Sequence, residues 1–510
     1  MAIVSLGLQQ LSMATVVWKI FLAIALFIVV HILSQLLLPR DRKRPPVVFS
    51  WIPVLGNAIE FGTNPIKFLQ ECQKKYGDVF TFYLVGKRVT VCLGPDGNQF
   101  VFNAKQNLAS AAAAYNDMTK HVFGRDIVFD APHSVFMEQK RFIKAGLNIE
   151  TFRRHVPKIV DETNRFFDQY EKPTGIMDTY TAFGKLIIYT ASATLLGREI
   201  RENLDDSVAQ LYYDLDQGFQ PMNFMFPNLP LPSYKRRDVA REKISEIYSK
   251  IIARRREEND TSNVDILQVL MDSTYKDGND VPDHHIAGIL TAALFGGQHT
   301  SATTSSWAVL ELAARPDVVK AIREEQIEKL GSLKVELTYD NLEQLTFLED
   351  VIRETLRLHP PIFQMMRKVV ADKMVFEKYG LEIPKNDYLC AVPGVTQIDP
   401  ACFHNPLKWD PFRWSKKTDP VHSMEQGDDA NMDYGFGAVG ISSRNPFLPF
   451  GAGRHRCIGE RFGYLQLKAV VATFVRKFDF ELVDSSVPKP DYTSMVVVPQ
   501  SSKIRYTWRE

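Results

Sequence analysis

The sequence predicts a mainly α-helical protein with a small β part, an α+β fold made of one domain behind an N-terminal transmembrane helix. Two stretches rich in apolar and β-branched residues, at 79–84 and 89–93, are typical of strands and lie early in the chain. Long helical patterns follow at 285–315 and 341–358. Because no Gly/Ser linker or internal repeat interrupts the chain after the anchor, we expect one domain, although the length alone would suggest about three.

Residues 20–38 form the predicted membrane span. They would make a helix of about 28 Å at about 1.5 Å per residue, and its only polar residues are His31, Ser34 and Gln35. A secretory signal peptide is the alternative, but no small-residue cleavage site precedes the basic cluster that follows.

That basic cluster gives the orientation. No Lys or Arg precedes Lys19, whereas four basic residues follow the span, so the rest of the chain is expected to face the cytosol. The four are Arg40, Arg42, Lys43 and Arg44. We therefore predict an anchor with a basic flank at 1–44 and one folded domain at 45–510.

The net charge of +1 argues against binding to nucleic acid, which favours a strongly basic surface. The five cysteines are scattered and predict no disulfide framework, which agrees with a reducing compartment.

Residues 450–459, Phe-Gly-Ala-Gly-Arg-His-Arg-Cys-Ile-Gly, present Cys457 in a glycine-rich, cationic loop before a predicted helix. Arg454, Arg456 and the helix N-terminus favour an anionic sulfur, and the glycines let backbone amides approach it. A lone cysteine is more often a buried structural residue. This setting instead favours a thiolate ligand for haem iron, and the lack of paired Cys/His spacing excludes zinc.

Two charged motifs precede that loop. Glu354 and Arg357 stand three residues apart on the predicted helix 341–358 and share one face. Alone, such a pair is a common surface ion pair worth about 0.3–0.5 kcal/mol. Pro-Phe-Arg at 411–413 follows it.

In this order, these residues resemble the cytochrome P-450 superfamily. The resemblance implies that Cys457 is the axial haem ligand, that Phe450 and Gly451 belong to the haem-binding loop, and that Arg413 joins Glu354 and Arg357 in a network bracing the haem pocket.

The predicted helix 285–315 contains Gly296 and Gly297, each costing about 1 kcal/mol against alanine, so a break between two helices is one interpretation. We favour a locally opened helix with room for dioxygen and substrate. The stretch Gly-Gln-His-Thr-Ser at 297–301 is similar to the fungal sterol (lanosterol) 14α-demethylase family, whereas most relatives carry an acid before the threonine. This implies that His299 and Thr300 move protons, although a lone helical histidine is more often structural.

His455 agrees with this family, which has histidine where most relatives place arginine, and the resemblance covers nearly the whole chain. It implies four partners for the haem propionates, namely Tyr115, Lys140, Arg367 and His455. It also implies a substrate pocket and access channel lined by Met118, Phe123, Phe129, Phe219, Phe224, Phe295, Gly296, Gly297, Phe363, Gln364 and Met495. The polar insertion at 415–445 is expected to be a surface loop.

The resemblance implies an NADPH- and O2-dependent monooxygenase with haem b, fed with electrons by NADPH–cytochrome P-450 reductase. Its reaction would remove the 14α-methyl group of lanosterol or eburicol in ergosterol biosynthesis, at the endoplasmic reticulum membrane. Basic residues on the expected proximal side could meet the acidic electron donor or pair internally: Arg454, Arg456, Arg461 and Lys468.

Departures from the family leave two alternatives open. Phe129 stands where relatives have tyrosine, Phe363-Gln364 where they have His-Ser, and Phe295 where an aliphatic residue is usual. These changes suit a diverged copy that oxidises a secondary metabolite such as a polyketide or terpenoid. They also suit an inhibitor-tolerant copy that confers resistance to azoles or natural products.

Overall fold

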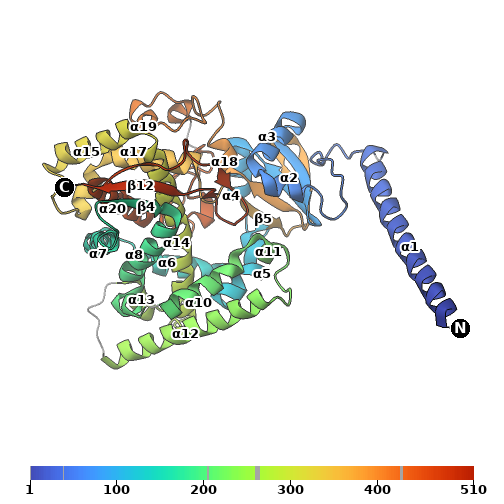
Figure 1. The fold of residues 1–510 in the computed structure, drawn as a ribbon, viewed down its shortest axis with the longest axis horizontal. Coiled ribbons are helices and arrows are strands. Elements are labelled where there is room, and N and C mark those ends of the chain that lie inside the picture. Colours follow the sequence, from blue (N-terminus) through green and yellow to red (C-terminus); the bar gives the residue numbers. More distant parts are fainter. Residues whose placement is uncertain (1, 38, 204–205, 259–264, 425–428, 510) are drawn as a thin grey trace.

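The computed structural model describes residues 2–37, 39–203, 206–258, 265–424 and 429–509 (Figure 1). Helix α1 (Ala2–Leu37) stands apart from a body made mostly of helices, with β5 (Met365–Val369) on the side nearest α1 and β4 (Thr174–Asp178) and β12 (Lys503–Trp508) on the side away from it. The predicted fold class, mainly α with a small β part, is confirmed.

Helix α1 carries the membrane-spanning pattern. Its segment Thr15–Leu37 reaches a mean hydropathy of 2.6 and is not buried against the body. It overlaps the predicted span at 20–38, whose last residue lies outside the described part of the chain. The connector then joins the body, because Val48 N donates to Thr81 O at 2.8 Å and Thr81 N donates to Pro46 O at 2.8 Å.

The largest sheet lies at the α1 end and has the strand order β1-β2-β8-β5-β3. Its strands are β1 (Val79–Leu84), β2 (Lys87–Cys92), β8 (Tyr388–Ala391), β5 (Met365–Val369) and β3 (Ala109–Ser110). The two stretches predicted as strands, at 79–84 and 89–93, correspond to β1 and β2, which pair as an antiparallel hairpin. Val85 and Gly86 connect them with φ of 47° and 76°, the left-handed pair that suits a two-residue hairpin turn.

Smaller sheets pair segments that are distant in the sequence. The order β4-β12-β9 joins β4 (Thr174–Asp178), β12 (Lys503–Trp508) and β9 (Phe478–Leu482). Two further pairs are β6 (Lys373–Phe376) with β7 (Leu381–Pro384), and β10 (Pro490–Asp491) with β11 (Val498–Pro499).

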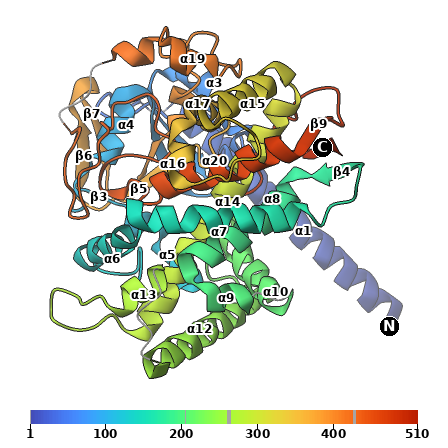
Figure 2. The ribbon, with the colours of Figure 1, turned by 90° about the vertical axis from the view of Figure 1, so that its left-hand side faces the viewer.

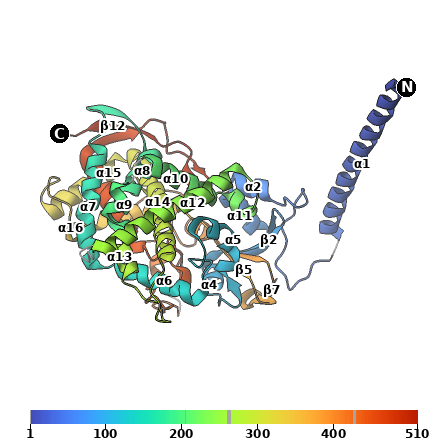
Figure 3. The ribbon, with the colours of Figure 1, turned by 90° about the horizontal axis from the view of Figure 1, so that it is seen from below.

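The helical part is built around α14 (Asp283–Ala313), which lies in the interior in Figures 2 and 3. Its residues are apolar or small on almost every side, the pattern of a helix buried all round. It packs against α8 (Thr179–Ala191), α12 (Pro232–Glu258), α17 (Thr346–Leu358) and α20 (Glu460–Lys477). In Figure 2, α7 (Ile149–Phe167) crosses the near face of the body.

The remaining helices complete the body around this centre. They are α2 (Ala58–Thr63), α3 (Pro65–Tyr76), α4 (Gly94–Phe102), α5 (Ala111–Phe123), α6 (His133–Gly146), α9 (Arg198–Glu202), α10 (Asp206–Asp216), α11 (Pro221–Met225), α13 (Ile266–Met271), α15 (Pro316–Leu330), α16 (Tyr339–Gln344), α18 (Pro393–Thr396) and α19 (Phe412–Lys416). A π-helical turn, Ser192–Leu196, extends α8.

The single helix predicted at 341–358 is wrong, because α16 ends at Gln344 and α17 begins at Thr346. The cause is Glu325 on α15, whose carboxylate accepts hydrogen bonds from Phe347 N at 2.6 Å and Leu348 N at 3.0 Å. These amides belong to the first turn of α17, where no helical carbonyl can reach them. A side chain from another helix therefore starts α17 at a point that local sequence did not indicate.

The predicted opening of the long helix is also wrong, as is the alternative of a break. Helix α14 runs without interruption through Gly296 and Gly297. Packing on several helices outweighs the cost of the two glycines, about 1 kcal/mol each.

Candidate active site around Cys457

The loop at 450–459 is a tight backbone cradle. Cys457 N donates to Phe450 O at 3.0 Å and closes the loop just before α20 begins at Glu460. Gly451 and Gly453 have φ of 67° and 63°, in the left-handed region that favours glycine. A Cβ on Gly453 would lie 2.7 Å from Phe102 O, so a larger residue cannot fit there. The glycines of the motif thus bring the loop against α4.

The Cys457 side chain is solvent-accessible, although the neighbouring Gly451, Ala452 and Arg456 are buried. Desolvation by the surrounding protein atoms raises the pKa of the Cys457 thiol, while the Gly459 amide and the nearby Lys140 and Arg456 cations oppose that rise. An accessible sulfur beside these donors suits the binding of a metal ion.

Arg456 supplies less free positive charge than the sequence indicated. Its guanidinium donates to Gly451 O at 2.9 Å and to the Glu460 carboxylate at 2.5 Å. Arg456 therefore holds the loop to the first turn of α20, and its charge is largely paired.

Arg367 is a cation beside this loop that has no carboxylate partner among the described residues. Arg367 is 5 % exposed. Among the described residues, the only hydrogen bond of its guanidinium goes to Met366 O at 2.7 Å. Burial lowers the pKa of Arg367 to about 10. No described residue forms a salt bridge with Arg367, and a buried, unpaired cation is costly. The surroundings of Arg367 thus suit an anionic group.

His455 faces the same cluster. Neither of its ring nitrogens has a hydrogen-bond partner among the described residues. Burial, together with the cations Arg367 and Lys140, holds the pKa of His455 well below its ordinary value. A buried imidazole with two unpaired nitrogens next to two cations is the setting that a carboxylate-bearing cofactor would satisfy.

Lys140 is already partly occupied. Its Nζ donates to Arg454 O and to Arg456 O, each at 3.0 Å. Burial lowers the pKa of Lys140 to about 7. Two of its three N–H groups therefore hold the backbone of the cysteine loop, which the resemblance to a family did not indicate.

Tyr115 completes the set of predicted propionate partners. Its hydroxyl oxygen accepts a hydrogen bond from Met366 N at 2.8 Å, and burial raises its pKa to about 12. The Phe129 ring lies 5.6 Å from the Tyr115 ring and 5.9 Å from the His455 ring. Tyr115, Phe129 and His455, which are distant in the sequence, thus meet on one side of the loop.

The middle of α14 borders open space. Gly296 is exposed and the following four residues are half-buried, whereas Ser301 and the residues up to Leu312 are buried. A Cβ at Gly296 or Gly297 would meet no atom within 4 Å. The glycines predicted to leave room beside the helix do so, without any opening of the helix itself.

The two predicted proton-handling residues lie on this stretch. Thr300 Oγ1 donates to Gly296 O at 2.9 Å. His299 Nε2 lies 2.8 Å from Asp216 Oδ1 at the end of α10. Both side chains of that pair keep about a quarter of their surface exposed, at 23 % and 24 %. Sequence reasoning missed Asp216, since nothing near it in the chain relates it to His299.

The predicted pocket residues fall into three groups. Phe123, Phe219 and Phe295 form an aromatic cluster with ring centroids 5.3–6.5 Å apart, and Phe295 is buried in the helical core. The second group lies around Tyr115, because the Phe224 ring is 5.9 Å from the Tyr115 ring, which Phe129 also contacts. Met118 is buried on α5.

The third group surrounds the β10–β11 turn. The Phe363 ring packs edge-on against Tyr492 at 5.6 Å, and Val497 N donates to Pro361 O at 3.0 Å. Gln364 Oε1 accepts from the Cys390 thiol at 3.4 Å. Met495 is half-buried in this turn.

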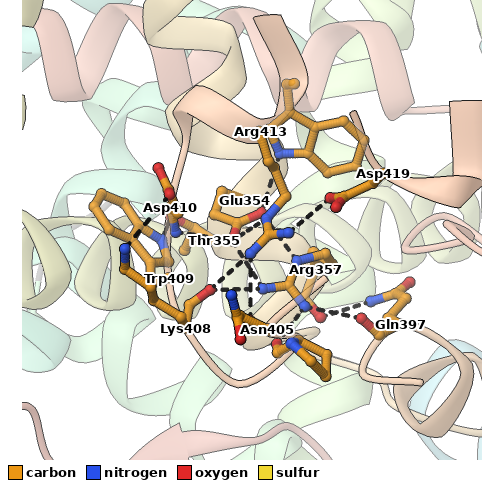
Figure 4. A network of polar contacts seen from close by, with 12 residues as sticks. Glu354, Thr355, Arg357, Gln397, Asn405, Lys408, Trp409, Asp410, Arg413 and Asp419 are labelled. Atoms are coloured by element: carbon orange, nitrogen blue, oxygen red, sulfur yellow. Dashed lines mark hydrogen bonds and ion pairs between the residues drawn. The ribbon is translucent and has the colours of Figure 1, made fainter. Parts of the chain in front are cut away.

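Glu354 and Arg357 form a buried network rather than a surface pair, since both side chains are 0 % exposed (Figure 4). Arg357 donates to both Glu354 oxygens at 2.9 and 2.8 Å, and Arg413 Nε donates to Glu354 Oε1 at 2.9 Å. The predicted three-residue network is present. The small stabilisation energy of a surface ion pair therefore does not apply to this buried network.

Three residues missed by sequence reasoning extend this network: Gln397, Trp414 and Asp419. Asp419 accepts from Arg413 Nη1 at 2.6 Å, and Trp414 Nε1 donates to Glu354 Oε2 at 3.1 Å. Gln397 donates to Arg357 O at 3.0 Å and accepts from Leu448 N at 3.1 Å. Because Leu448 lies two residues before Phe450, Gln397 links the network to the cysteine loop.

The expected basic surface for an electron donor is only half present. Lys468 is buried and donates to Glu349 at 3.2 Å, while Arg456 is buried and paired with Glu460. Arg461 is exposed and Arg454 half-buried. Of the two alternatives left open by the sequence, internal pairing therefore holds for Arg456 and Lys468.

The insertion at 415–445 is not simply a surface loop. Asp429 is buried and accepts from Asn103 Nδ2 at 3.0 Å, Ser442 Oγ at 2.7 Å and Ser443 N at 2.9 Å. Phe436 is 6 % exposed. The predicted surface loop is wrong for these residues, and positions 425–428 lie outside the described ones.

Comparisons with known proteins place this site in a family. The family model described as Cytochrome P450 matches residues 45–508. The solved structure of retinoic acid-bound cyanobacterial CYP120A1 is 22 % identical, with a TM-score of 0.77 over 92 % of this chain and 100 % of that chain, which shows a shared fold. Fold and family model together define a cytochrome P450.

Relatives narrow the family further. The lanosterol 14-alpha demethylase of Cunninghamella elegans is 70 % identical over 96 % of this chain and 96 % of that protein. The lanosterol 14-alpha demethylase of Mycosarcoma maydis is 45 % identical over 94 % and 90 %, and the eburicol 14-alpha-demethylase of Uncinula necator is 44 % identical over 94 % and 93 %. The chain belongs to the sterol 14α-demethylase family of the cytochrome P450s.

This membership confirms the expected monooxygenase class, with haem as cofactor, dioxygen as co-substrate and electrons from a reductase. Together with the apolar helix α1, it supports a protein anchored to a membrane.

Proposed function

We propose that this protein is a haem-thiolate monooxygenase that removes the 14α-methyl group of lanosterol or eburicol, with Cys457 as the iron ligand. The observation that carries the proposal is the 70 % identity to a lanosterol 14-alpha demethylase over 96 % of the chain. When bound, haem b supplies the activation of dioxygen with electrons that originate from NADPH.

The chain's own residues suit this cofactor. The accessible Cys457 sulfur would bind the iron, and Arg367, His455, Tyr115 and Lys140 would hold the propionates. The support is electrostatic, because Arg367 is buried without a carboxylate and both His455 nitrogens are unpaired. Glu354, Arg357 and Arg413 would keep the loop rigid through Gln397.

Protons would reach the reaction along α14. The His299–Asp216 pair is partly exposed and lies one residue from Thr300, whose hydroxyl is held by Gly296 O. An imidazole can accept a proton from water at one ring nitrogen and donate one from the other. Thr300 would orient the last hydrogen bond of this relay.

Substrate would lie beside Gly296 and Gly297, where a Cβ meets no atom within 4 Å. Apolar side chains from α5, α11 and the β10–β11 turn would position the rigid sterol and exclude water. Phe129, Phe363 and Gln364 would shape this pocket, and no second function is proposed, because the relatives that match nearly the whole chain are lanosterol and eburicol demethylases.

The anchor at 1–44 would hold the catalytic domain at 45–510 on the cytosolic face of the endoplasmic reticulum in a single pass. Its support is the apolar segment Thr15–Leu37, followed by the basic residues at 40–44.

Product analysis tests the function. The purified full-length protein is incubated with a fungal reductase, NADPH and either lanosterol or eburicol, and sterols are identified by mass spectrometry. The 14-demethylated diene is expected from wild type and from Cys402→Ala, a buried cysteine outside the loop, but not from Cys457→Ala. A normal haem-thiolate spectrum without any sterol product would overturn the substrate assignment.

A further inference from the structure

We propose that Phe436, in the insertion before the cysteine loop, is a positioning residue for that loop and acts through Lys140. The inference rests on the proposed role of Cys457 as iron ligand and adds a residue to which neither the sequence motifs nor the comparisons give a role.

The contact geometry supports it. Lys140 Nζ lies 3.7 Å from the centroid of the Phe436 ring, a close cation–π contact between a buried ammonium and a buried ring. Its other bonds go to Arg454 O and Arg456 O, the carbonyls on either side of His455. The same ammonium thus contacts the Phe436 ring and both carbonyls, so the ring limits how far Lys140 can move away from the loop.

The insertion presents the ring from a fixed turn. Gly435 N and Gly437 N donate to Asp433 Oδ1 at 2.7 and 2.9 Å, and both glycines have φ near 100° (100° and 101°). Residues other than glycine rarely adopt that conformation, so the two glycines permit this turn, and their hydrogen bonds to Asp433 hold it. Lys144 Nζ lies over the same ring at 5.5 Å and adds a second cation.

The consequence falls on the cysteine loop. Lys140 donates to the carbonyls of residues 454 and 456, which stand just before Cys457 in the loop. If Phe436 is lost, Lys140 is free to move and the carbonyls of residues 454 and 456 lose a fixed donor. The loop then holds its sulfur less firmly on the iron.

A purely structural role for a buried ring is the competing explanation, and the chain offers a matched control. Phe376 is also 6 % exposed and stacks on Phe100 at 4.2 Å, and among the described residues no lysine lies over its ring. Phe376→Leu therefore removes equal burial without touching Lys140.

The experiment uses the full-length haem-loaded protein and follows the 450 nm band of the reduced carbon monoxide complex, which reports a thiolate on the iron. Phe436→Leu is expected to speed the loss of this band at least fivefold at fixed mild urea. Phe436→Trp, which keeps an aromatic face, and Phe376→Leu are expected to stay within twofold of wild type. Thermal midpoints from circular dichroism show whether Phe436→Leu and Phe376→Leu are equally destabilised. If Phe436→Leu does not accumulate, Phe436→Met replaces it in the same test.

A double-mutant cycle with Lys140→Met identifies the route. In that background, Phe436→Leu is expected to cause no further acceleration, because its partner is gone. Multiplicative effects of the two changes, or equal band lifetimes in Phe436→Leu and Phe376→Leu, would overturn the positioning role. A wild-type protein with no 450 nm band would instead refute Cys457 ligation, on which this inference rests.

Discussion

Glu354→Gln tests the buried network with a nearly isosteric change. In the wild type, Glu354 Oε1 accepts from Arg357 Nη2, Arg413 Nε and Asp410 N, and Oε2 accepts from Arg357 Nε and Trp414 Nε1. Glutamine replaces one of these oxygens by an NH2 group. In either orientation, at least two buried donors lose their acceptor and Arg357 keeps an uncompensated charge.

The expected loss follows from these contacts. Each buried donor left without an acceptor costs about 1–3 kcal/mol, so two of them cost about 2–6 kcal/mol. Removing one partner of a buried ion pair costs about 3–5 kcal/mol. We therefore expect Glu354→Gln to lower the free energy of unfolding by about 3–5 kcal/mol, a large part of the about 5–15 kcal/mol of a native protein.

Urea unfolding, followed by circular dichroism and by the 450 nm band, measures the loss. Asp340→Asn is the control, because the Asp340–Arg153 pair has two similar bonds but both side chains are mostly exposed. It should shift the urea midpoint far less. A loss below about 1 kcal/mol for Glu354→Gln, the range of a surface pair, would refute the argument from burial.

Four other outcomes are expected. Cys457→Ala should abolish the 450 nm band, whereas Cys402→Ala should retain it; a band that survives in Cys457→Ala excludes ligation by this residue. Thr300→Ala should bind a normal amount of haem but consume more NADPH per sterol product, and an unchanged ratio would contradict a role in proton delivery. Glu325→Ala should cost about 1–2 kcal/mol, because two amides at the start of α17 lose their acceptor, while Glu324→Ala on the exposed face should not; equal urea midpoints would contradict the capping role. Burial raises the pKa of Asp387 to about 6, above its unfolded value, so the folded state binds the extra proton and stability falls as pH rises from about 4 to about 6. Asp387→Asn should remove that dependence, and an unchanged pH profile of the urea midpoint would contradict it.

The structure shows what the phenylalanine at position 129 changes in its surroundings. A tyrosine at 129 would add a hydroxyl to a ring that lies 5.6 Å from the Tyr115 ring and 5.9 Å from the His455 ring, whereas the phenylalanine makes only ring contacts there. The cluster keeps its cations and its tyrosine, so the change removes one hydrogen-bonding group and leaves the charge of the site as it was.

Local patterns were sufficient for those features that depend on neighbouring residues. The β1–β2 hairpin follows from apolar, β-branched strands around Val85-Gly86, and the cysteine loop follows from glycines that the backbone needs at 451 and 453. The apolar run before residue 38 was enough to predict the α1 span. These features depend on the spacing of residues along the chain, which is visible in the sequence.

Contacts between distant segments were decided only by the tertiary structure. Glu325 starts α17 from another helix, Lys468 turns inward to Glu349, and Phe436 reaches Lys140 from a loop that is polar in composition. The burial of Glu354 and Arg357 belongs to the same class, since a pair three residues apart looks identical on a surface and in a core. The sequence by itself determined the family motifs, the anchor and the ligand loop, because these depend on local backbone chemistry. Which charges are buried, paired or left for a cofactor depends on the segments that packing brings together.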